Sequence, residues 1–189
     1  LKLSRGLGDV YKRQVQDLSS VPVIGHLEGI CHTYIDKDAN LSMAKKILVN
    51  AKLRNTSICG ATETLLIHKN KSKNINEILT ELTKKECFIY ADKKIFKIFK
   101  GNAKLANNKT WSKEHLSAKI SVKLVDSIRD AVNHINKYGT MHTDAIITNN
   151  RLSAKYFIKN IKSSIAIHNS STQYADGGEF GFGGEVGIS

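Results

Sequence analysis

The 189-residue sequence has little proline, tryptophan or cysteine, and it has no long apolar run. A membrane-spanning helix needs about 20 consecutive apolar residues, and no stretch of this sequence approaches that length. The sequence therefore predicts a soluble protein without a membrane partner. Its 3 cysteines include no CxxC pair and make no disulfide framework, so they suit a reducing compartment such as the cytoplasm.

Acidic residues are also scarce, because 17 Asp and Glu stand against 29 Lys and Arg and leave a net charge of +12. Such an excess is typical of proteins that neutralise nucleic-acid phosphates. Here, however, the lysines are scattered among Asn and Ile, with no repeated basic stripe and no aromatic residues beside them for base stacking. The distribution indicates a solvated surface and favours no nucleic-acid partner.

His26, Glu28, Cys31 and His32 lie close together in the sequence and raise the question of a metal site. Their spacing contains neither of the patterns tested for zinc, CxxC and His-x3-His. In a strand, side chains alternate between the two faces, so Cys31 and His32 would point in opposite directions. We therefore predict no metal site and assign these residues to strand packing.

The hydrophobic fraction of 41% is enough for a folded core, and the pattern alternates between strand and helix spacing. Helices are predicted over residues 41–53, 75–84, 126–138 and 152–161. Strands are predicted over residues 30–35, 65–68, 87–90, 143–148 and 165–167, and residues 21–24 form another strand or a loop. Residues 93–106 are poorly patterned and should form a short helix and a loop. Strands alternating with helices are typical of an α/β fold with a largely parallel sheet.

The segment from Arg54 to His68 has the pattern expected around a reactive thiol. Cys59 follows a short polar loop, and small residues and an apolar run come after it. Backbone N–H groups at the start of a turn or helix favour a thiolate and can lower a cysteine pKa from about 8.5 toward 7. The same groups can stabilise an oxyanion on a carbonyl that the sulfur attacks. A buried structural cysteine is the alternative that the local sequence leaves open.

Three blocks of the sequence, in the same order, resemble one enzyme family. They are residues 21–24 with 29–36 (VPVI, GICHTYID), residues 50–54 with 58–66 (NAKLR, ICGATETLL) and residues 169–181 with 185–189 (NSSTQYADGGEFG, EVGIS). The family that they resemble is gamma-glutamyl phosphate reductase, or glutamate-5-semialdehyde dehydrogenase, in the aldehyde dehydrogenase superfamily. The resemblance implies an aldehyde dehydrogenase-like catalytic domain, with a largely parallel sheet flanked by helices.

The resemblance also implies roles for single residues. Cys59 matches the catalytic nucleophile, and Arg54 and Asn169 match substrate-binding positions. Glu114 matches the glutamate that holds the nicotinamide ribose, because a carboxylate can accept hydrogen bonds from both ribose hydroxyls. A solvated surface glutamate is the alternative at that position.

The implied reaction is the NADPH-dependent reduction of L-glutamyl 5-phosphate to L-glutamate 5-semialdehyde, the second step of proline biosynthesis. The Cys59 thiolate would attack the acyl carbon and release phosphate, and hydride from NADPH would reduce the thioacyl enzyme. The resemblance further implies a cytoplasmic homo-oligomer with glutamate 5-kinase as a pathway partner. Two alternatives stay open, another aldehyde dehydrogenase superfamily oxidoreductase or a catalytically inactive α/β binding module.

Three features of the sequence qualify this picture. Asn55 and Thr56 stand where the family often has a second Arg and a Pro, which weakens the case for substrate anchoring by this loop. His142 lies in a further family-like block, and its role is open, with an ordinary loop histidine as the alternative. The glycine-rich residues 176–187 should form an ordered loop that closes over the active site, since glycine allows close backbone approach to a ligand.

Residues 1–14 are expected to be foreign to the fold. They are basic, connect to no helical or strand periodicity, and from Arg5 to Gln14 resemble translated sequencing adaptor. Residues 15–189 are then the catalytic domain fragment of a longer enzyme, truncated at both ends. Because most of the dinucleotide-binding domain would lie upstream, we predict that the 189-residue chain alone does not turn over substrate.

Overall fold

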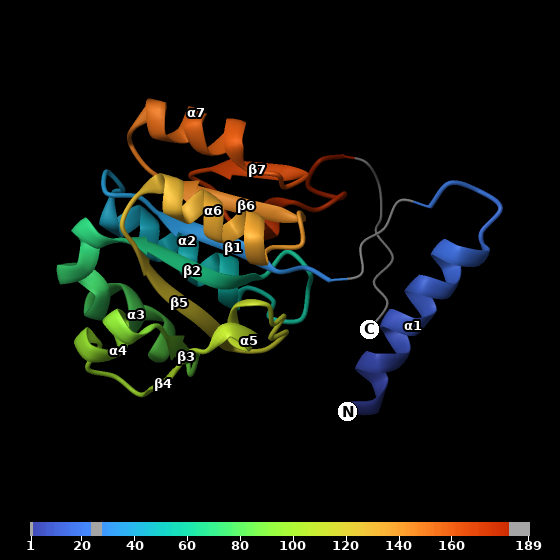
Figure 1. Cartoon of the computed structure of the whole chain (residues 1–189), viewed down its shortest axis with the longest axis horizontal. Helices are drawn as coiled ribbons and strands as arrows, with labels where there is room; N and C mark the ends of the chain where they lie inside the picture. The colour runs from blue at the N-terminus through green and yellow to red at the C-terminus, as the bar shows by residue number, and fades with distance from the viewer. Residues whose placement is uncertain (1, 24–27, 182–189) are drawn as a thin grey trace. The chain divides into compact units, whose positions relative to one another are not determined.

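The computed structural model describes residues 2–23 and 28–181, with side chains from residue 10 onward. The chain divides into two compact units, one formed by residues 29–175 and the other by residues 1–28 with 176–189. The larger unit holds the sheet and all helices except α1 (Figure 1).

A seven-stranded sheet forms the centre of the larger unit, with strand order β4-β3-β5-β2-β1-β6-β7. Every neighbouring pair is parallel, as the sequence predicted for most of the sheet. The strands are β1 (Cys31–Ile35), β2 (Thr62–His68), β3 (Phe88–Ala91), β4 (Ala103–Leu105), β5 (Lys119–Val125), β6 (Thr143–Ile147) and β7 (Ile165–His168). The predicted α/β class is therefore confirmed.

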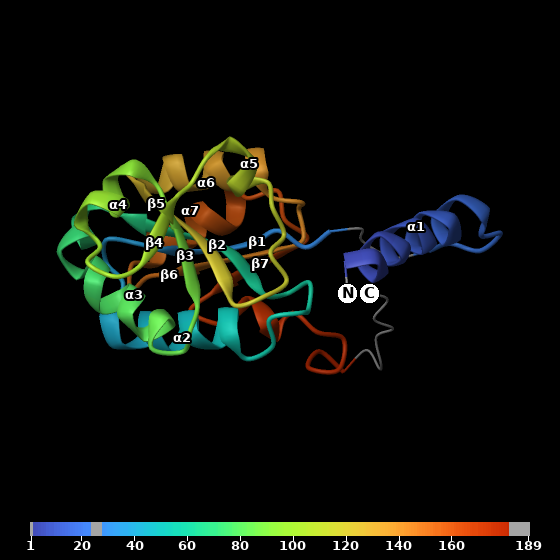
Figure 2. The same cartoon turned by 90° about the horizontal axis from the view of Figure 1, so that it is seen from below.

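Helices cover both faces of this sheet, with α2 and α3 on one face and α6 and α7 on the other (Figure 2). The first core contains apolar side chains of α2, α3 and α4, and the second contains those of α6 and α7. The helices are α2 (Leu41–Leu53), α3 (Ile75–Thr83), α4 (Lys93–Ile98), α5 (Asn108–Trp111), α6 (Ile128–Tyr138) and α7 (Arg151–Asn160), with short 3-10 helices η1 (Lys69–Asn74) and η2 (Thr172–Tyr174).

Local chemistry explains where the predicted helices begin. Asn40 caps α2 by accepting a hydrogen bond from the Met43 N–H, and Ser127 and Asn150 cap α6 and α7 in the same manner. Helix α2 then buries Ala44, Leu48 and Ala51 on one face. All four predicted helices form, with α2 at the predicted bounds and the others within two residues of theirs.

Three elements differ from the expectations. Residues 93–106 contain the short edge strand β4 in addition to the helix α4, and strand β5 was not among the predicted strands. Residues 21–23 form no strand, which agrees with the loop alternative, and Ile24 lies outside the described residues. Helix α1 (Lys2–Leu18) occupies a segment for which we expected no regular structure.

The helical spacing in α1 was overlooked. Tyr11, Val15 and Leu18 follow one another at intervals of four and three residues, which is the spacing of one helical stripe. Val10, Tyr11 and Leu18 are exposed. The assignment of residues 1–14 to adaptor sequence stays a prediction, since a helix says nothing about its origin.

Candidate functional site

Three of the singled-out side chains lie at one edge of the sheet. All strands are parallel, so all begin at the same end of the sheet. This end is here called the amino edge, and it is distinct from the edge strands β4 and β7. Cys59 precedes β2, Glu114 precedes β5 and His142 precedes β6. The fold therefore places all three at the amino edge, although they are far apart in the sequence.

Cys59 sits in a tight turn between α2 and β2. The Ala61 N–H donates to the Ile58 carbonyl at 3.0 Å, which closes the turn around Cys59 and Gly60. Cys59 is partly exposed, whereas Cys31 and Cys87 are buried. Of the three cysteines, Cys59 is thus the one that is not buried.

The start of β1 packs directly against this turn. A Cβ added to Gly29 would lie 2.3 Å from the Cys59 carbonyl oxygen and 2.8 Å from its Cβ. Only glycine fits such a close approach between two backbones. The Cys31 thiol donates to the same Cys59 carbonyl, with 3.1 Å between sulfur and oxygen. Burial raises the pKa of the Cys31 thiol well above its usual value, so this thiol remains a donor.

Alternation of side chains along β1 separates Cys31 from His32, as predicted. Cys31 contacts the turn of Cys59, while His32 lies edge-on to His134 of α6 and is 2.8 Å from Asp144. Within the described residues, no group of three or more His, Cys, Asp or Glu side chains is arranged to hold a metal ion. The packing role assigned to these two residues is consistent with their contacts.

Glu114 reaches the turn of Cys59 through Gly29. Its Oε1 accepts a hydrogen bond from the Gly29 N–H at 2.8 Å, across 85 positions of sequence. The side chain lies at the amino edge and is half-buried. The structure therefore brings Glu114 and Cys59 to the two sides of one glycine. The role of Glu114 as a cofactor ligand stays a prediction.

His142 lies on the other side of the Cys31 thiol. Its Nδ1 is 3.6 Å from the Cys31 sulfur and 2.9 Å from the Thr143 hydroxyl. The ring is half-buried. His142 thus contacts Cys31, which in turn contacts Cys59. The sequence did not reveal this relationship because Cys31 and His142 are 111 positions apart.

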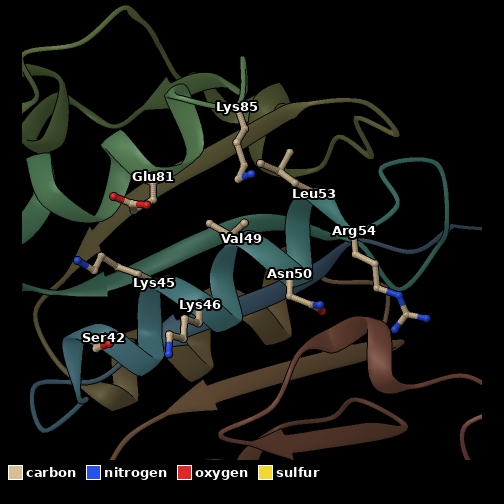
Figure 3. Close-up of a pocket in the computed structure, with 9 residues that line it drawn as sticks. All are labelled: Ser42, Lys45, Lys46, Val49, Asn50, Leu53, Arg54, Glu81 and Lys85. Carbon is tan, nitrogen blue, oxygen red and sulfur yellow. The ribbon is translucent and has the colours of Figure 1, made fainter.

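Arg54 ends α2 and lies at the end of a groove between α2 and α3. The groove has a volume of about 730 Å³, and Figure 3 shows Arg54 at the opposite end from Lys45. Its lining residues are mostly cationic or polar: Ser42, Lys45, Lys46, Val49, Asn50, Leu53, Arg54, Glu81 and Lys85. This surface attracts anions, which suits the predicted role of Arg54.

Asn169 follows β7 and therefore lies at the opposite edge of the sheet. Its side-chain amide forms two hydrogen bonds with the Thr148 backbone. It accepts from the Thr148 N–H at 2.9 Å and donates to the Thr148 carbonyl at 3.0 Å. Its φ of 56° is in the left-handed region that asparagine tolerates. Asn169 and Arg54 line a second pocket of about 340 Å³ beside α2, which does not include Cys59.

Two buried groups that the sequence did not single out support the turn of Cys59. Lys52 and Glu63 form an ion pair of 2.9 Å, with both side chains fully buried, and Glu63 also accepts from the Leu116 N–H. Burial raises the pKa of Glu63, and the nearby Lys52 opposes that shift. Gln173 is the second group and had no sequence signal beyond its place in the third family-like block.

The glycine-rich tail belongs to the smaller unit over Asp176–Gly181. There the Phe180 N–H donates to the Asp176 carbonyl, and Gly181 has a φ of +74° that favours glycine. Residues 182–187 lie outside the described residues. None of the helices in the described parts of the chain is long and apolar enough to cross a membrane.

Comparisons with known proteins place this geometry in a family. No protein-family model matches the chain. Gamma-glutamyl phosphate reductase of Bartonella quintana is 47% identical over 185 residues, which are 98% of this chain and 44% of that protein. The crystal structure of gamma-glutamyl phosphate reductase from Thermotoga maritima superimposes with a TM-score of 0.87 at 35% identity, covering 94% of this chain and 43% of that one.

More distant structures share the fold. An acetylating aldehyde dehydrogenase from Geobacillus thermoglucosidasius aligns with a TM-score of 0.67 at 16% identity, over 92% of this chain and 46% of that one. The chain spans somewhat less than half the length of the relatives that it matches. Its sequence and its aldehyde dehydrogenase-like fold together show that the chain belongs to the gamma-glutamyl phosphate reductase family.

Proposed function

We propose that the chain is the nucleophile-bearing part of a reductase that converts L-glutamyl 5-phosphate to L-glutamate 5-semialdehyde and phosphate in proline biosynthesis. The names of its relatives support the reaction. The observation that carries it is the partly exposed Cys59, held in a turn at the amino edge while the other two cysteines are buried. Its cytoplasmic location, assembly as a homo-oligomer and link to glutamate 5-kinase are part of the same proposal.

Cys59 performs the first chemical step. Its thiolate attacks the acyl carbon, the carbon–sulfur bond forms, and the bond to the phosphate oxygen breaks. Phosphate departs with the bonding electrons and leaves a thioester on Cys59. Because phosphate is already a good leaving group, this direction needs no carboxylate to activate water. Glu63 is therefore free of a catalytic role and keeps its ion pair with Lys52.

Arg54 and Asn169 are the proposed substrate-binding residues. Arg54 stands at the end of a cationic groove and suits the phosphate or carboxylate of the substrate, which guanidinium groups bind well. Asn169 shares a pocket with Arg54 while its amide is bonded to Thr148. Its contribution is thus to the shape of that pocket through the position of the backbone.

Glu114 is the proposed residue for a nicotinamide cofactor, NADPH by family resemblance. A carboxylate has two oxygens with about four acceptor sites and can accept from more than one donor, and Oε1 of Glu114 accepts from the Gly29 N–H. Glu114 and Cys59 flank the same glycine, so Glu114 would hold the cofactor's ribose on the side of Gly29 away from Cys59's backbone contact. The reduced cofactor, when bound, supplies the hydride for the thioester.

The test is made in the full-length enzyme that carries this chain. We expect Cys59→Ser to abolish the reduction of L-glutamyl 5-phosphate and the reverse, phosphate-dependent oxidation of L-glutamate 5-semialdehyde. Cys31→Ser and Cys87→Ser should retain activity. Equal loss from all three substitutions would remove Cys59 from its role. The 189-residue chain alone should be inactive, and robust NADPH-dependent turnover by it would contradict that part of the proposal.

Two other assignments make different predictions. A superfamily member with another substrate would prefer simple aldehydes to glutamate 5-semialdehyde in the same assay. An inactive binding module would carry an inert Cys59, which a thiol-alkylation assay at neutral pH detects. Rapid alkylation of Cys59 together with preference for glutamate 5-semialdehyde would support the reductase against both.

A further inference from the structure

We propose that Cys31 is a positioning residue for Cys59, through a hydrogen bond from its buried thiol to the Cys59 carbonyl. The inference rests on the proposed role of Cys59 as the nucleophile. It assigns a purpose to a second cysteine that the reaction itself does not use.

The contact between the two residues is direct. The Cys31 sulfur lies 3.1 Å from the Cys59 carbonyl oxygen, and the Cys31 side chain is 0% exposed. The pairing of β1 with β2 also shifts at this point, since Cys31 pairs with Thr62 whereas His32 pairs with Thr64. Such irregularities commonly re-aim a side chain beside an active site. Here the shift lies between the strand that carries Cys31 and the strand that follows Cys59.

The surroundings of Cys31 suit a permanent donor. Desolvation is the largest cause that raises the pKa of this thiol, and the Asp144 carboxylate acts in the same direction. The sulfur therefore keeps its proton over the working range of a cytoplasmic enzyme. His142 Nδ1 lies 3.6 Å from the same sulfur and closes its other side.

This bond fixes more than one atom. A peptide unit is planar, so holding the Cys59 carbonyl toward Cys31 also directs the Gly60 N–H the opposite way. Gly29 packs on the same carbonyl and on the Cβ of Cys59. The main chain around Cys59 is therefore fixed by its contacts with Cys31 and Gly29. These contacts set the direction in which the Cys59 side chain points.

Cys87 provides a matched comparison within the protein. It too is buried, at 2% exposure, and burial raises the pKa of its thiol to about 12. In the described residues its thiol has no hydrogen-bond partner. A buried cysteine that only fills space, as most do, should tolerate valine of similar volume. Cys31 should not, because valine removes the donor.

The experiment compares Cys31→Val, Cys31→Ser and Cys87→Val in the full-length enzyme. We expect Cys31→Val to lower kcat about three- to tenfold with KM within about twofold, the size of one net hydrogen bond. Cys31→Ser keeps a donor and should restore kcat to within about twofold. Cys87→Val should match the wild type. Equal behaviour of Cys31→Val and wild type, or equal impairment by serine and valine, would overturn the inference.

Two further readouts do not depend on turnover. The pH profile of Cys59 alkylation by iodoacetamide should change in Cys31→Val and return in Cys31→Ser, even if the substrate assignment proves wrong. In wild-type protein, the infrared S–H stretching band lost on Cys31→Ser should lie at lower frequency than the band lost on Cys87→Ser, since hydrogen bonding weakens the S–H bond. Coincident bands would show that Cys31 donates no such bond, whether or not its valine variant folds.

Discussion

Gln173 and Asn55 are joined by two reciprocal hydrogen bonds. The Asn55 N–H donates to the Gln173 Oε1 at 3.2 Å, and the Gln173 amide donates to the Asn55 carbonyl at 3.0 Å. The same amide donates to the Ala51 carbonyl at 2.9 Å, although Gln173 is 118 positions from Asn55. This clasp ties the end of α2 and the loop before Cys59 to the 3-10 helix η2.

Replacement of Gln173 should loosen that loop. Gln173→Leu leaves the Ala51 and Asn55 groups without their partner, and a buried unsatisfied polar group costs about 1–3 kcal/mol. We expect the free energy of unfolding in urea to fall by roughly 2–3 kcal/mol. The control is Gln16→Leu on the exposed face of α1, which should change stability by less than about 0.5 kcal/mol. A similarly small change for Gln173→Leu would show that the clasp is dispensable.

Gly29→Ala tests the packing of β1 against the nucleophile turn. The new Cβ would meet the Cys59 backbone at 2.3 and 2.8 Å, and backbone cannot move aside as a flexible side chain can. Overpacking of this kind costs about 1–3 kcal/mol. We expect that loss in urea unfolding, together with a changed rate of Cys59 alkylation.

The matched control for this substitution is Gly178→Ala in the smaller unit. There the added Cβ meets only the Asp176 carboxylate, at 3.0 Å, which is the end of a partly exposed side chain and not backbone. It should leave both stability and Cys59 alkylation nearly unchanged. Wild-type alkylation kinetics in Gly29→Ala would mean that the turn of Cys59 does not depend on the backbone beneath it.

The sequence predicted those parts of the fold that depend on neighbouring residues. Asn40 and the apolar spacing after it define α2, and alternation of strands with helices is sufficient for a parallel sheet. Cys59 precedes a predicted strand, and a parallel sheet brings such positions to one edge. Strand β5, which follows Glu114, was not predicted, so the grouping of Glu114 with Cys59 is seen only in the folded sheet.

The remaining features depend on contacts between distant segments. Nothing near Gln173 in the sequence encodes its bonds to Asn55, and nothing near Asn169 shows that its amide holds Thr148. Strand β4 was missed because Ala103–Leu105 is short and largely exposed at the sheet edge, so it lacks the apolar run that marks a buried strand. The order of the strands in the sheet likewise depends on contacts along the whole chain and not on any local pattern.

The buried ion pair of Lys52 and Glu63 should behave as a unit. Lys52→Met leaves the Glu63 carboxylate buried without its partner, and breaking a buried pair costs about 3–5 kcal/mol. The double variant Lys52→Met with Glu63→Leu removes both charges and should recover most of that loss. Unfolding in urea at pH 7 measures all variants in one thermodynamic cycle. Additive effects of the two single substitutions would show that the pair is not coupled.

Stability should fall in mild acid because two histidines are buried in the neutral form. Burial lowers the pKa of His134 to about 2 and that of His115 to about 4. In the unfolded chain both titrate near their usual pKa of about 6.5. Below that pH, His134 and His115 bind protons in the unfolded state but stay neutral in the folded state. The stabilisation is therefore complete above pH of about 6.5 and decreases as the pH falls through that value.

Each of these histidines should contribute about 1.4 kcal/mol of lost stability per pH unit between pH 6 and pH 5. That interval lies above the usual pKa of carboxylates, but burial raises the pKa of Glu63. Urea unfolding at pH 8, 6 and 5 measures the slope, and His134→Phe, which keeps an aromatic ring between Trp111 and Tyr138, should reduce the slope by one histidine. Because Glu63 is the same in wild type and in His134→Phe, the difference between their slopes isolates the histidine. An equal slope in wild type and His134→Phe would mean that His134 accepts its proton in the folded state, and that Lys123, 3.0 Å from its Nδ1, does not hold it neutral.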